Sequence, residues 1–337
     1  MPDAGGGVDE WQARHLDLAA YLSRIGYDAD LAPTGRTLAG LHRAQVAAIP
    51  FENADIMLGR GIAVELTGVQ DKLVRRGRGG YCFEHGLLLA AALERLGYRA
   101  DRLLASVGGP RNARTHLVLR VRAGGRCWLA DTGFGTGLLE PLPFGDTGAR
   151  AQYGWTYRLL ADGERSWKLQ ERQGDSWATL YWFDDQPQHA ADIVVANHFT
   201  STFPGSPFVR QLVVIRKDTT GLRRLTGRRL SITSPGQPGD ERYLGDDEFA
   251  RALTGVFGLR LSAAESARLT RITADTALPT AVGPGGVRRI RRALGPADGP
   301  DAARTFRPSG SSCCPPSPSP GGRVGAPGLT GQLKGGW

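Results

Sequence analysis

The sequence predicts an α+β protein with an N-terminal helical bundle, a central antiparallel β barrel and a smaller C-terminal α/β segment. Three observations predict this order. Apolar residues recur at helical spacing up to Gly97, alternate with period two after it, and show both periods beyond Ser206. We therefore expect a helical bundle over residues 1–98, a β barrel over 99–205 and an α/β segment over 206–282.

Capping residues and helix breakers set the limits of four expected helices in the N-terminal part. The fourth is apolar nearly all round, which is typical of a helix buried inside the protein. The first lies between Asp17 and Gly26, the second starts at Thr37 and ends before Pro50, the third surrounds residues 69–74, and the fourth runs from near Cys82 to Gly97.

Short alternating runs, separated by turns that contain glycine, indicate antiparallel strands after the helices. Several short strands at regular spacing are typical of a small sheet or barrel. They are expected at 115–121, 126–134, 155–160, 166–172 and 176–183, with turns at Gly124–Gly125, Asp162–Gly163 and Gly174–Asp175. Beyond Ser206, strands are expected at 211–215 and 229–232 and helices at 246–256 and 263–272.

The composition limits the class of protein. With 337 residues, 41% hydrophobic and 22% charged, the chain has the composition of a soluble globular protein. Its longest apolar run, Leu87–Leu93, is far shorter than the roughly 20 residues of a membrane span. The first residues show no secretory signal pattern. Four cysteines are too few for a disulfide framework in this chain, so we expect a reducing, cytoplasmic location.

The segment 281–337 differs from the rest of the chain in composition. It holds 13 glycines and 9 prolines, together with eight basic and two acidic residues that supply most of the net charge of +9. We expect a low-complexity, disordered tail over 283–337, with a short basic helix at 287–294. No aromatic residues alternate with the basic ones, so no nucleic-acid partner is expected. Cys313 and Cys314 lack metal ligands at suitable spacing.

Cys82 is a candidate nucleophile. It follows Gly79 and Gly80, which permit a tight turn, and it opens the buried helix. At a helix N-terminus, the dipole and the free backbone N–H groups favour a thiolate over a thiol. The alternative interpretation is a buried structural cysteine, because free cysteines most often belong to a core.

His116 and Asp131 are the candidate base and its orienting carboxylate. His116 begins an expected strand and Asp131 ends the next. A short hairpin joins these strands, so both side chains can lie at one end of the sheet. With Asp131 on one imidazole nitrogen, the other nitrogen is left as a base, and a cysteine completes the arrangement that acyl transfer needs. The alternative is a histidine and an aspartate without a shared role.

His85 is a rival base, because it lies three residues after Cys82 on the same helix. No acidic orienting residue is evident for it, since Glu84 is adjacent in sequence and points to another side. We expect His85 to be a solvated residue on the helix surface, and Cys127 to belong to the core.

Four segments together resemble one family. They are IPFEN at 49–53, RGGYCFEHG at 78–86, LADTGFG at 129–135 and TSTFPGSPF at 200–208. In this order, with a histidine before the third, they resemble the arylamine N-acetyltransferases. The resemblance covers most of residues 10–280.

The resemblance implies a catalytic triad of Cys82, His116 and Asp131. It also implies a three-part fold of helical bundle, β barrel and α/β lid, around a core like that of the cysteine proteases. The implied acyl donor is acetyl-coenzyme A as a cosubstrate and the implied acceptor is a small arylamine, with no tightly bound cofactor, no metal and no membrane partner.

By the same resemblance, Phe51, Phe134 and Phe208 line the acceptor pocket, where aromatic side chains can stack on an aryl ring. The chain departs from the family pattern at one place. The family usually has an asparagine two residues after the glutamate that matches Glu84, and this chain has Gly86. Because the three triad residues are present, we expect catalysis with altered local packing.

Three other functions fit parts of this pattern. An amide synthase of the same fold would take a polyketide from a carrier protein and release it as a macrolactam. A Cys–His–Asp hydrolase would admit water to the acyl-enzyme, and a nucleic-acid-binding protein would use the basic tail. We expect the acetyltransferase, acting on arylamines or arylhydrazines by a ping-pong mechanism through an acetyl-cysteine thioester.

Overall fold

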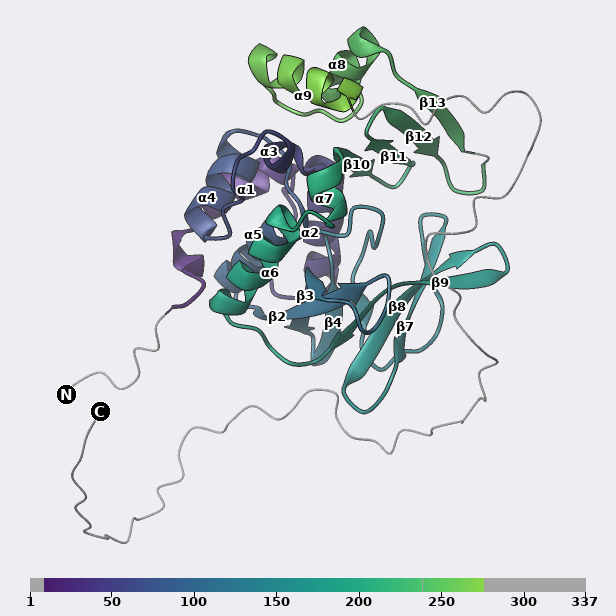
Figure 1. Ribbon diagram of the computed structural model, residues 1–337. Coiled ribbons are helices and arrows are strands. Elements are labelled where there is room, and N and C mark those ends of the chain that lie inside the picture. The colour runs from purple at the N-terminus through teal and green to yellow at the C-terminus, as the bar shows by residue number, and fades with distance from the viewer. Residues whose placement is uncertain (1–8, 238, 276–337) are drawn as a thin grey trace, which may run out of the picture. The chain divides into compact units, whose positions relative to one another are not determined.

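The structure is a computed structural model that describes residues 9–237 and 239–275 of the chain (Figure 1). All element limits below refer to these residues. The tail expected over 283–337 and the helix expected at 287–294 lie outside the described residues.

Two helices of 14 residues, α2 and the buried α5, form the N-terminal part of the chain together with several short helices. Asp17 caps α1 by accepting a hydrogen bond from the Ala20 N–H at 3.0 Å, and Gly26 ends it with a φ of 65°. Both limits agree with the sequence prediction. The elements are η1 (Ala13–His15), α1 (Leu18–Ile25), α2 (Gly35–Ala48), α3 (Ala54–Met57), α4 (Leu66–Gln70), the π-helical turn η2 (Asp71–Arg75) and α5 (Cys82–Arg95).

Two helix limits differ from the sequence prediction. Helix α2 is capped by Thr34 and not by Thr37, since the Thr34 hydroxyl accepts a hydrogen bond from the Thr37 N–H at 3.2 Å. The pattern favours Thr37 because the apolar repeat begins only at Leu38. The third helix starts earlier than expected and changes from α to π geometry at Asp71, which carries it on to Arg75.

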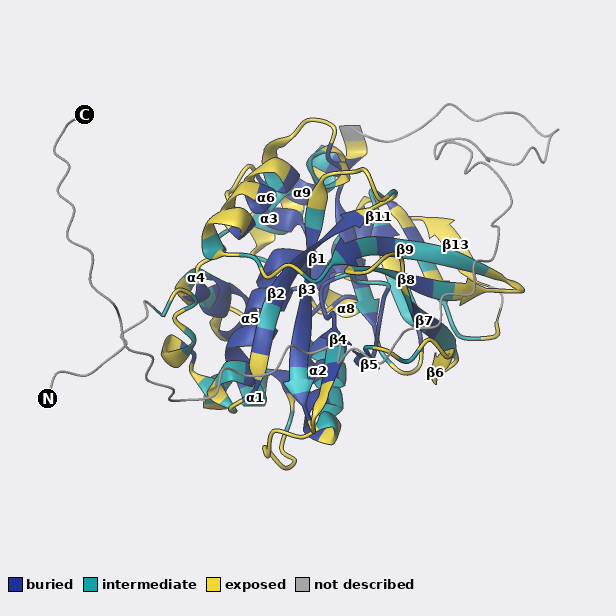
Figure 2. Ribbon diagram, turned by 90° about the horizontal axis from the view of Figure 1, so that it is seen from below, coloured by how far each residue is buried: buried dark blue, intermediate teal, exposed yellow. Residues whose placement is uncertain are grey.

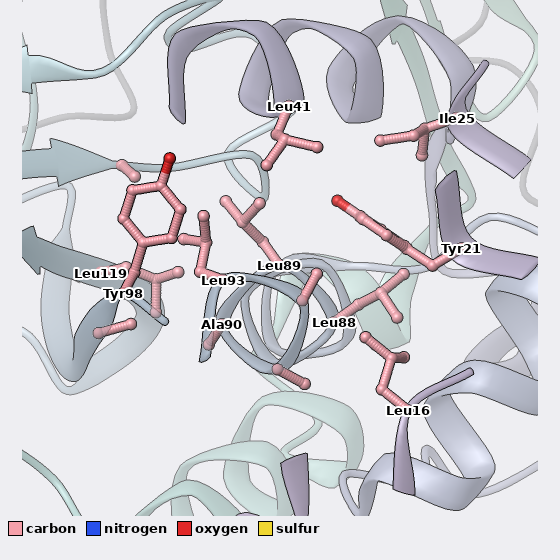
Figure 3. Close-up of a cluster of buried hydrophobic side chains, with 14 of the residues drawn as sticks. Leu16, Tyr21, Ile25, Leu41, Leu88, Leu89, Ala90, Leu93, Tyr98 and Leu119 are labelled. Carbon is pink, nitrogen blue, oxygen red and sulfur yellow. The ribbon is translucent and has the colours of Figure 1, made fainter. Parts of the chain in front are cut away.

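Helix α5 lies at the centre of the N-terminal part. It is buried from Cys82 to Leu93. In Figure 3, its side chains lie between Leu41 of α2 and the strand that carries Leu119. Helix α5 contacts other elements on all sides, which explains why it is apolar around its whole circumference. This packing fixes the helix that begins at Cys82.

Eight antiparallel strands form a strongly curved, nearly closed sheet, which confirms the expected barrel. Their order is β5-β4-β3-β2-β9-β8-β7-β6. The turn between β3 and β4 uses Gly124 and Gly125 at φ values of 58° and 73°, as the hairpin pattern predicts. The strands are β2 (Arg99–Val107), β3 (Arg114–Ala123), β4 (Arg126–Ala130), β5 (Leu142–Pro143), β6 (Arg150–Gln152), β7 (Trp155–Ala161), β8 (Ser166–Gln173) and β9 (Ser176–Asp184).

Helix α6 (Ala190–Thr202) is not predicted by the sequence pattern. It packs Ile193 and Ala196 against Leu104 and Leu117 of the barrel. Its outer surface is also apolar, with a 70% exposed Val195. A helix that is apolar on both sides shows no helical period. The caps of α6 are His189 and Phe203, which are not typical cap residues, so the sequence pattern does not reveal this helix.

A second sheet of five antiparallel strands, the lid sheet, has the order β1-β10-β11-β12-β13. Its edge strand β1 (Phe51–Glu52) comes from the N-terminal part and pairs with β10, placing Phe51 opposite Ile215. The sequence pattern predicts only two of these strands. The other elements are α7 (Pro207–Arg210), β10 (Val213–Lys217), β11 (Leu222–Thr226), β12 (Arg229–Thr233), β13 (Asp240–Tyr243), α8 (Asp246–Gly255) and α9 (Ala263–Asp275).

Strands β2 and β3 and helix α5 are largely buried, whereas β13 is exposed along its length (Figure 2). Cys82 and His116, described below, therefore lie on largely buried elements. Among the described residues, no helix combines the length and the apolar character that crossing a membrane requires.

Helix α5 and strand β3 approach each other closely at Gly86. A Cβ at this position would lie 2.7 Å from Cδ2 and 2.9 Å from Cγ of Leu117, inside van der Waals contact. Leu117 follows His116 on β3, so this contact holds the helix of Cys82 against the strand of His116. The leucine side chain occupies the space into which a larger residue at Gly86 would project.

We expect Gly86→Ala to lower the free energy of unfolding by about 1–3 kcal/mol, as in other overpacked cores. Helix propensity alone would raise it by up to about 1 kcal/mol. Gly255→Ala in α8 is the matched control, because nothing lies within 4 Å of its Cβ position. Urea unfolding followed by circular dichroism measures both variants. An equal gain in stability for the two variants would contradict the close approach.

Candidate active site

Cys82 is the first residue of α5 and is only 3% exposed. Glu84 supports the helix start, because its carboxylate accepts a hydrogen bond from the Tyr81 N–H at 3.0 Å. The preceding turn leaves no room for side chains. A Cβ at Gly79 would lie 2.3 Å from a backbone oxygen, and one at Gly80 would lie 2.7 Å from Glu84 Oε2. The two glycines therefore allow the tight entry that the sequence predicts.

Buried ion pairs support the same turn. Lys72 Nζ lies 2.9 Å from both Glu84 and Asp55. Arg78 pairs with Glu52 at 3.0 Å. Burial raises the pKa of Glu84 to about 7, although Lys72 opposes this change. Removing one partner would leave a buried charge unpaired, which is strongly destabilising, so these pairs hold the chain in place before Cys82.

His116 and Asp131 form a buried pair. Nε2 of the imidazole lies 2.8 Å from Oδ2 of Asp131, and the two side chains are 4% and 0% exposed. His116 lies on β3 and Asp131 follows β4, so the hairpin brings them together as the sequence predicts. Asp131 Oδ1 also accepts the Gly133 N–H at 2.9 Å. With Nε2 on the carboxylate, Nδ1 is the nitrogen left for the sulfur of Cys82.

The charges of this pair reinforce each other. Burial alone would lower the pKa of His116, but the Asp131 carboxylate and a hydrogen bond with Cys82 raise it to about 10. Burial alone would raise the pKa of Asp131, but His116 and the Gly133 N–H lower it. At neutral pH the site therefore holds an imidazolium between a carboxylate and a sulfur. This is the charge distribution that stabilises a thiolate.

A second histidine, His42 of α2, positions Asp131 through its backbone. His42 Nε2 accepts the Asp131 N–H at 3.0 Å, so its Nδ1 carries the proton and donates to Leu139 O at 3.0 Å. Burial lowers the pKa of His42 to about 4, so the ring is neutral at neutral pH and can accept. Nothing in the sequence points to this role, because His42 and Asp131 are 89 residues apart.

The prediction that His85 is a solvated surface residue is wrong. His85 is 1% exposed, and its Nε2 lies 3.3 Å from Pro50 O. Burial lowers its pKa to about 4. Because α5 is buried on all sides, a residue next to Glu84 on this helix has no access to solvent. Cys127 is buried at 5% exposure, which agrees with its expected place in the core.

A cleft of about 570 Å³ opens in front of Cys82. His116 lines it, and Asp131 lies behind His116. Phe51, Phe134 and Phe208 also line it, so the structure brings all six predicted site residues to one place. The other lining residues are Val107, Asn112, Ala113, Thr115, Gly133, Thr136, Phe199, Thr200, Phe203, Gly205, Ser206, Pro207, Gln211, Val213, Ile215 and Arg224.

Aromatic rings form much of the cleft wall. The Phe134 ring lies with its centroid 5.2 Å from that of His116, and the rings of Phe51 and Phe208 are 5.7 Å apart. Two further phenylalanines, Phe199 and Phe203 of the α6 region, stack at 4.7 Å. The sequence pattern does not indicate this second pair, because α6 itself is not predicted.

This geometry suits one kind of chemistry. A buried sulfur next to an imidazolium, whose other nitrogen is held by a carboxylate, can accept an acyl group and pass it on. Within the described ranges, no cluster of three or more histidine, cysteine, aspartate or glutamate side chains is placed to hold a metal ion.

Comparisons with known proteins agree with this chemistry. The family model described as N-acetyltransferase matches residues 35–266. An arylamine N-acetyltransferase of Mycolicibacterium smegmatis is 35% identical over 257 residues, which cover 73% of this chain and 93% of that protein. The Nocardia farcinica arylamine N-acetyltransferase structure has a TM-score of 0.74 and 37% identity, covering 77% of this chain and 95% of that one.

A solved relative carries a bound ligand. The structure of the Mycobacterium marinum arylamine N-acetyltransferase in complex with CoA has a TM-score of 0.73 and 33% identity. The match covers 78% of this chain and 100% of that one. The fold and the family model thus define an N-acetyltransferase, which is an acyltransferase enzyme. More narrowly, the chain belongs to the arylamine N-acetyltransferase family.

We expect Asp131→Asn to slow alkylation of Cys82 by iodoacetamide at pH 7. Without the carboxylate, the pKa of His116 falls and the sulfur loses its positive neighbour. Each unit by which the pKa of His116 falls changes its protonation equilibrium about tenfold. We therefore expect the rate of Cys82 alkylation to fall about tenfold or more. Peptide mass spectrometry measures the rate. Asp101→Asn, whose side chain pairs with Arg120 at 2.7 Å on the barrel, should keep the parent rate.

Proposed function

We propose that this protein is an acetyl-CoA-dependent N-acetyltransferase that acetylates arylamines or arylhydrazines by a ping-pong mechanism, through an acetyl thioester on Cys82. The observation that carries the proposal is the Cys82 sulfur in the cleft, beside the buried His116–Asp131 pair. The substrates follow from the relatives, which are named arylamine N-acetyltransferases and include one in complex with CoA.

In the first half-reaction, the Cys82 thiolate attacks the thioester carbonyl of acetyl-CoA. The acetyl–sulfur bond of the donor breaks, CoA leaves as a thiol with the proton of His116, and a new thioester forms on Cys82. One thioester replaces another, so the step is close to neutral in free energy. The backbone N–H of Cys82, at the start of α5, has no acceptor inside the helix and can donate to the oxyanion.

In the second half-reaction, the amine attacks acetyl-Cys82. His116, which gave its proton to CoA, now accepts the proton of the amine, and the sulfur leaves as a thiolate. Asp131 keeps the same imidazole nitrogen bonded throughout and stabilises the charged ring. Arylamines suit this step because they are weakly basic and stay unprotonated at neutral pH.

The three parts of the chain contribute separately to the proposed enzyme. Residues 1–98 carry the nucleophile, 99–205 carry His116 and Asp131, and 206–282 form the lid. In the proposal the cosubstrate is acetyl-CoA, no cofactor is tightly bound, and residues 283–337 take no part in catalysis. A cytoplasmic location remains part of the proposal, based on the small number of cysteines.

Intact-protein mass spectrometry after addition of acetyl-CoA tests the proposal directly. We expect the parent protein to gain one acetyl group and Cys82→Ser to gain none, because the hydroxyl is a much weaker nucleophile than the thiolate. Adding an aminosalicylate should then remove the acetyl group from the enzyme and yield the N-acetyl product.

Other outcomes of the same experiment identify the competing functions. Rapid consumption of acetyl-CoA without any amine would indicate a hydrolase. A protein that gains no mass from acetyl-CoA, but is loaded by an acyl chain on a carrier protein, would indicate an amide synthase. Either outcome would contradict the proposed donor and acceptor.

We expect Phe208→Ala to raise the KM for the arylamine by roughly two- to tenfold, since an aromatic contact contributes about 0.5–1.5 kcal/mol beyond its buried area. The acetylation of Cys82 by acetyl-CoA should be unchanged. Steady-state kinetics of the two half-reactions separate these effects. Phe203→Ala is the comparison, because Phe203 is 47% exposed and should affect the arylamine KM less.

A further inference from the structure

Lys217, at the end of β10, is buried among neutral partners. It is 2% exposed, although lysine is rarely buried unless it is paired with an acid. Its Nζ donates hydrogen bonds to Thr136 O at 2.7 Å, Gly137 O at 2.6 Å and the Tyr157 hydroxyl at 2.6 Å. All three N–H groups of a charged ammonium are therefore used.

Aromatic rings complete the surroundings of Lys217. Its Nζ lies 4.2 Å from the centroid of the Trp155 ring and 5.2 Å from that of Tyr157. Such contacts stabilise a desolvated cation. The site is thus built to hold an ammonium group without a direct carboxylate partner.

The hydrogen bonds of Lys217 connect separate parts of the fold. Lys217 belongs to the lid sheet, Tyr157 belongs to β7 of the barrel, and Thr136 and Gly137 belong to the loop that follows Asp131. One side chain therefore joins the lid sheet, the barrel and the loop.

That loop also forms part of the active site. Three residues before Thr136, a Cβ at Gly133 would lie 2.8 Å from the Cα of Cys82, so the loop backbone rests on the helix start. The next residue, Phe134, has its ring 5.2 Å from the His116 ring. A shift of the loop would move both contacts.

A small buried cavity links Lys217 to the rear of the site. It has a volume of about 10 Å³, and Lys217, Asp131, Thr132 and His85 are among the residues that line it. This is close to the smallest space that holds one water molecule. His85 Nδ1 is buried and has no hydrogen-bond partner among the described residues. Lys217 and Asp131 therefore line the same cavity.

We propose that Lys217 is a positioning residue for acyl transfer: its ammonium ties the loop 133–137 to the lid sheet and so holds Gly133 against Cys82 and Phe134 against His116. The proposal rests on the proposed function, because it concerns the same site. When the ammonium loses its proton, its two remaining N–H groups are neutral and therefore weaker donors. The third contact then persists only if the Tyr157 hydroxyl turns away from Gly137 and Glu171 to donate to the amine.

The groups around Lys217 determine the pH at which its ammonium loses the proton. Burial lowers the pKa of Lys217 to about 7, and the carboxylate of Glu171 on β8 opposes the change. Glu171 Oε1 lies 3.1 Å from the Tyr157 hydroxyl, and burial raises the pKa of Tyr157, which stays neutral. Across the cavity, Asp131 is ionised and His85 neutral at neutral pH. The tie therefore weakens as the pH rises through about 7.

The test follows the rate of Cys82 acetylation by acetyl-CoA from pH 6 to pH 9 in four proteins. The parent should lose rate as the pH rises past about 7. Lys217→Met should be about tenfold slower at low pH and lack this decline. Glu171→Gln removes the carboxylate that favours the ammonium, so it should keep the low-pH rate and move the midpoint to lower pH. Lys168→Met, which removes an ion pair with Asp162 at 3.0 Å on the barrel, should match the parent.

A parallel series with iodoacetamide separates this proposal from the proposed function. If acetyl-CoA does not react but alkylation of Cys82 shows the same Lys217-dependent midpoint, the positioning role stands and the acetyltransferase proposal fails. A Lys217→Met protein that keeps the parent midpoint and loses only thermal stability would overturn the positioning role. If Lys217→Met does not fold, the midpoint of Glu171→Gln decides, and an unchanged midpoint overturns the proposal.

Discussion

The hydrogen bond of 2.8 Å between His116 Nε2 and Asp131 Oδ2 is the interaction on which the rest of the site depends. It keeps a charged imidazole in a buried position, and it directs the other ring nitrogen toward Cys82. Burial would abolish the charge of either group alone. Because each opposes the effect of burial on the other, the pair stays ionised and supplies the positive neighbour that a thiolate needs.

Several backbone contacts hold this pair in register with the sulfur. His42 accepts the N–H of Asp131, and elements approach closely at two glycines, Gly86 against Leu117 of β3 and Gly133 against the start of α5. The triad is thus assembled by the docking of one helix on one hairpin, with no space at the contact for extra side-chain atoms. Interiors packed at this density transmit a local shift to their neighbours, which is why a distant residue such as Lys217 can matter to the reacting atoms.

Much of this arrangement can be predicted from the sequence, because its signals are local. The hairpin that unites His116 and Asp131 is marked by Gly124–Gly125, and the entry to α5 by two glycines. The rest depends on contacts between residues far apart in the chain. His42 meets Asp131 across 89 residues, α6 is apolar on its exposed side as well, and β1 is a strand of two residues. No pattern of period or spacing contains such information.

The short strand β1 has a consequence for biosynthesis. Phe51 forms one wall of the cleft, yet its partner in the lid sheet is Ile215. Contacts between residues so far apart in the chain form late in folding. On the ribosome, the segment of Cys82 emerges before its base, and the wall closes only after β10 has followed. The nascent thiol is therefore made before the residues that activate it, and the cleft around it is completed only when β10 has been synthesised.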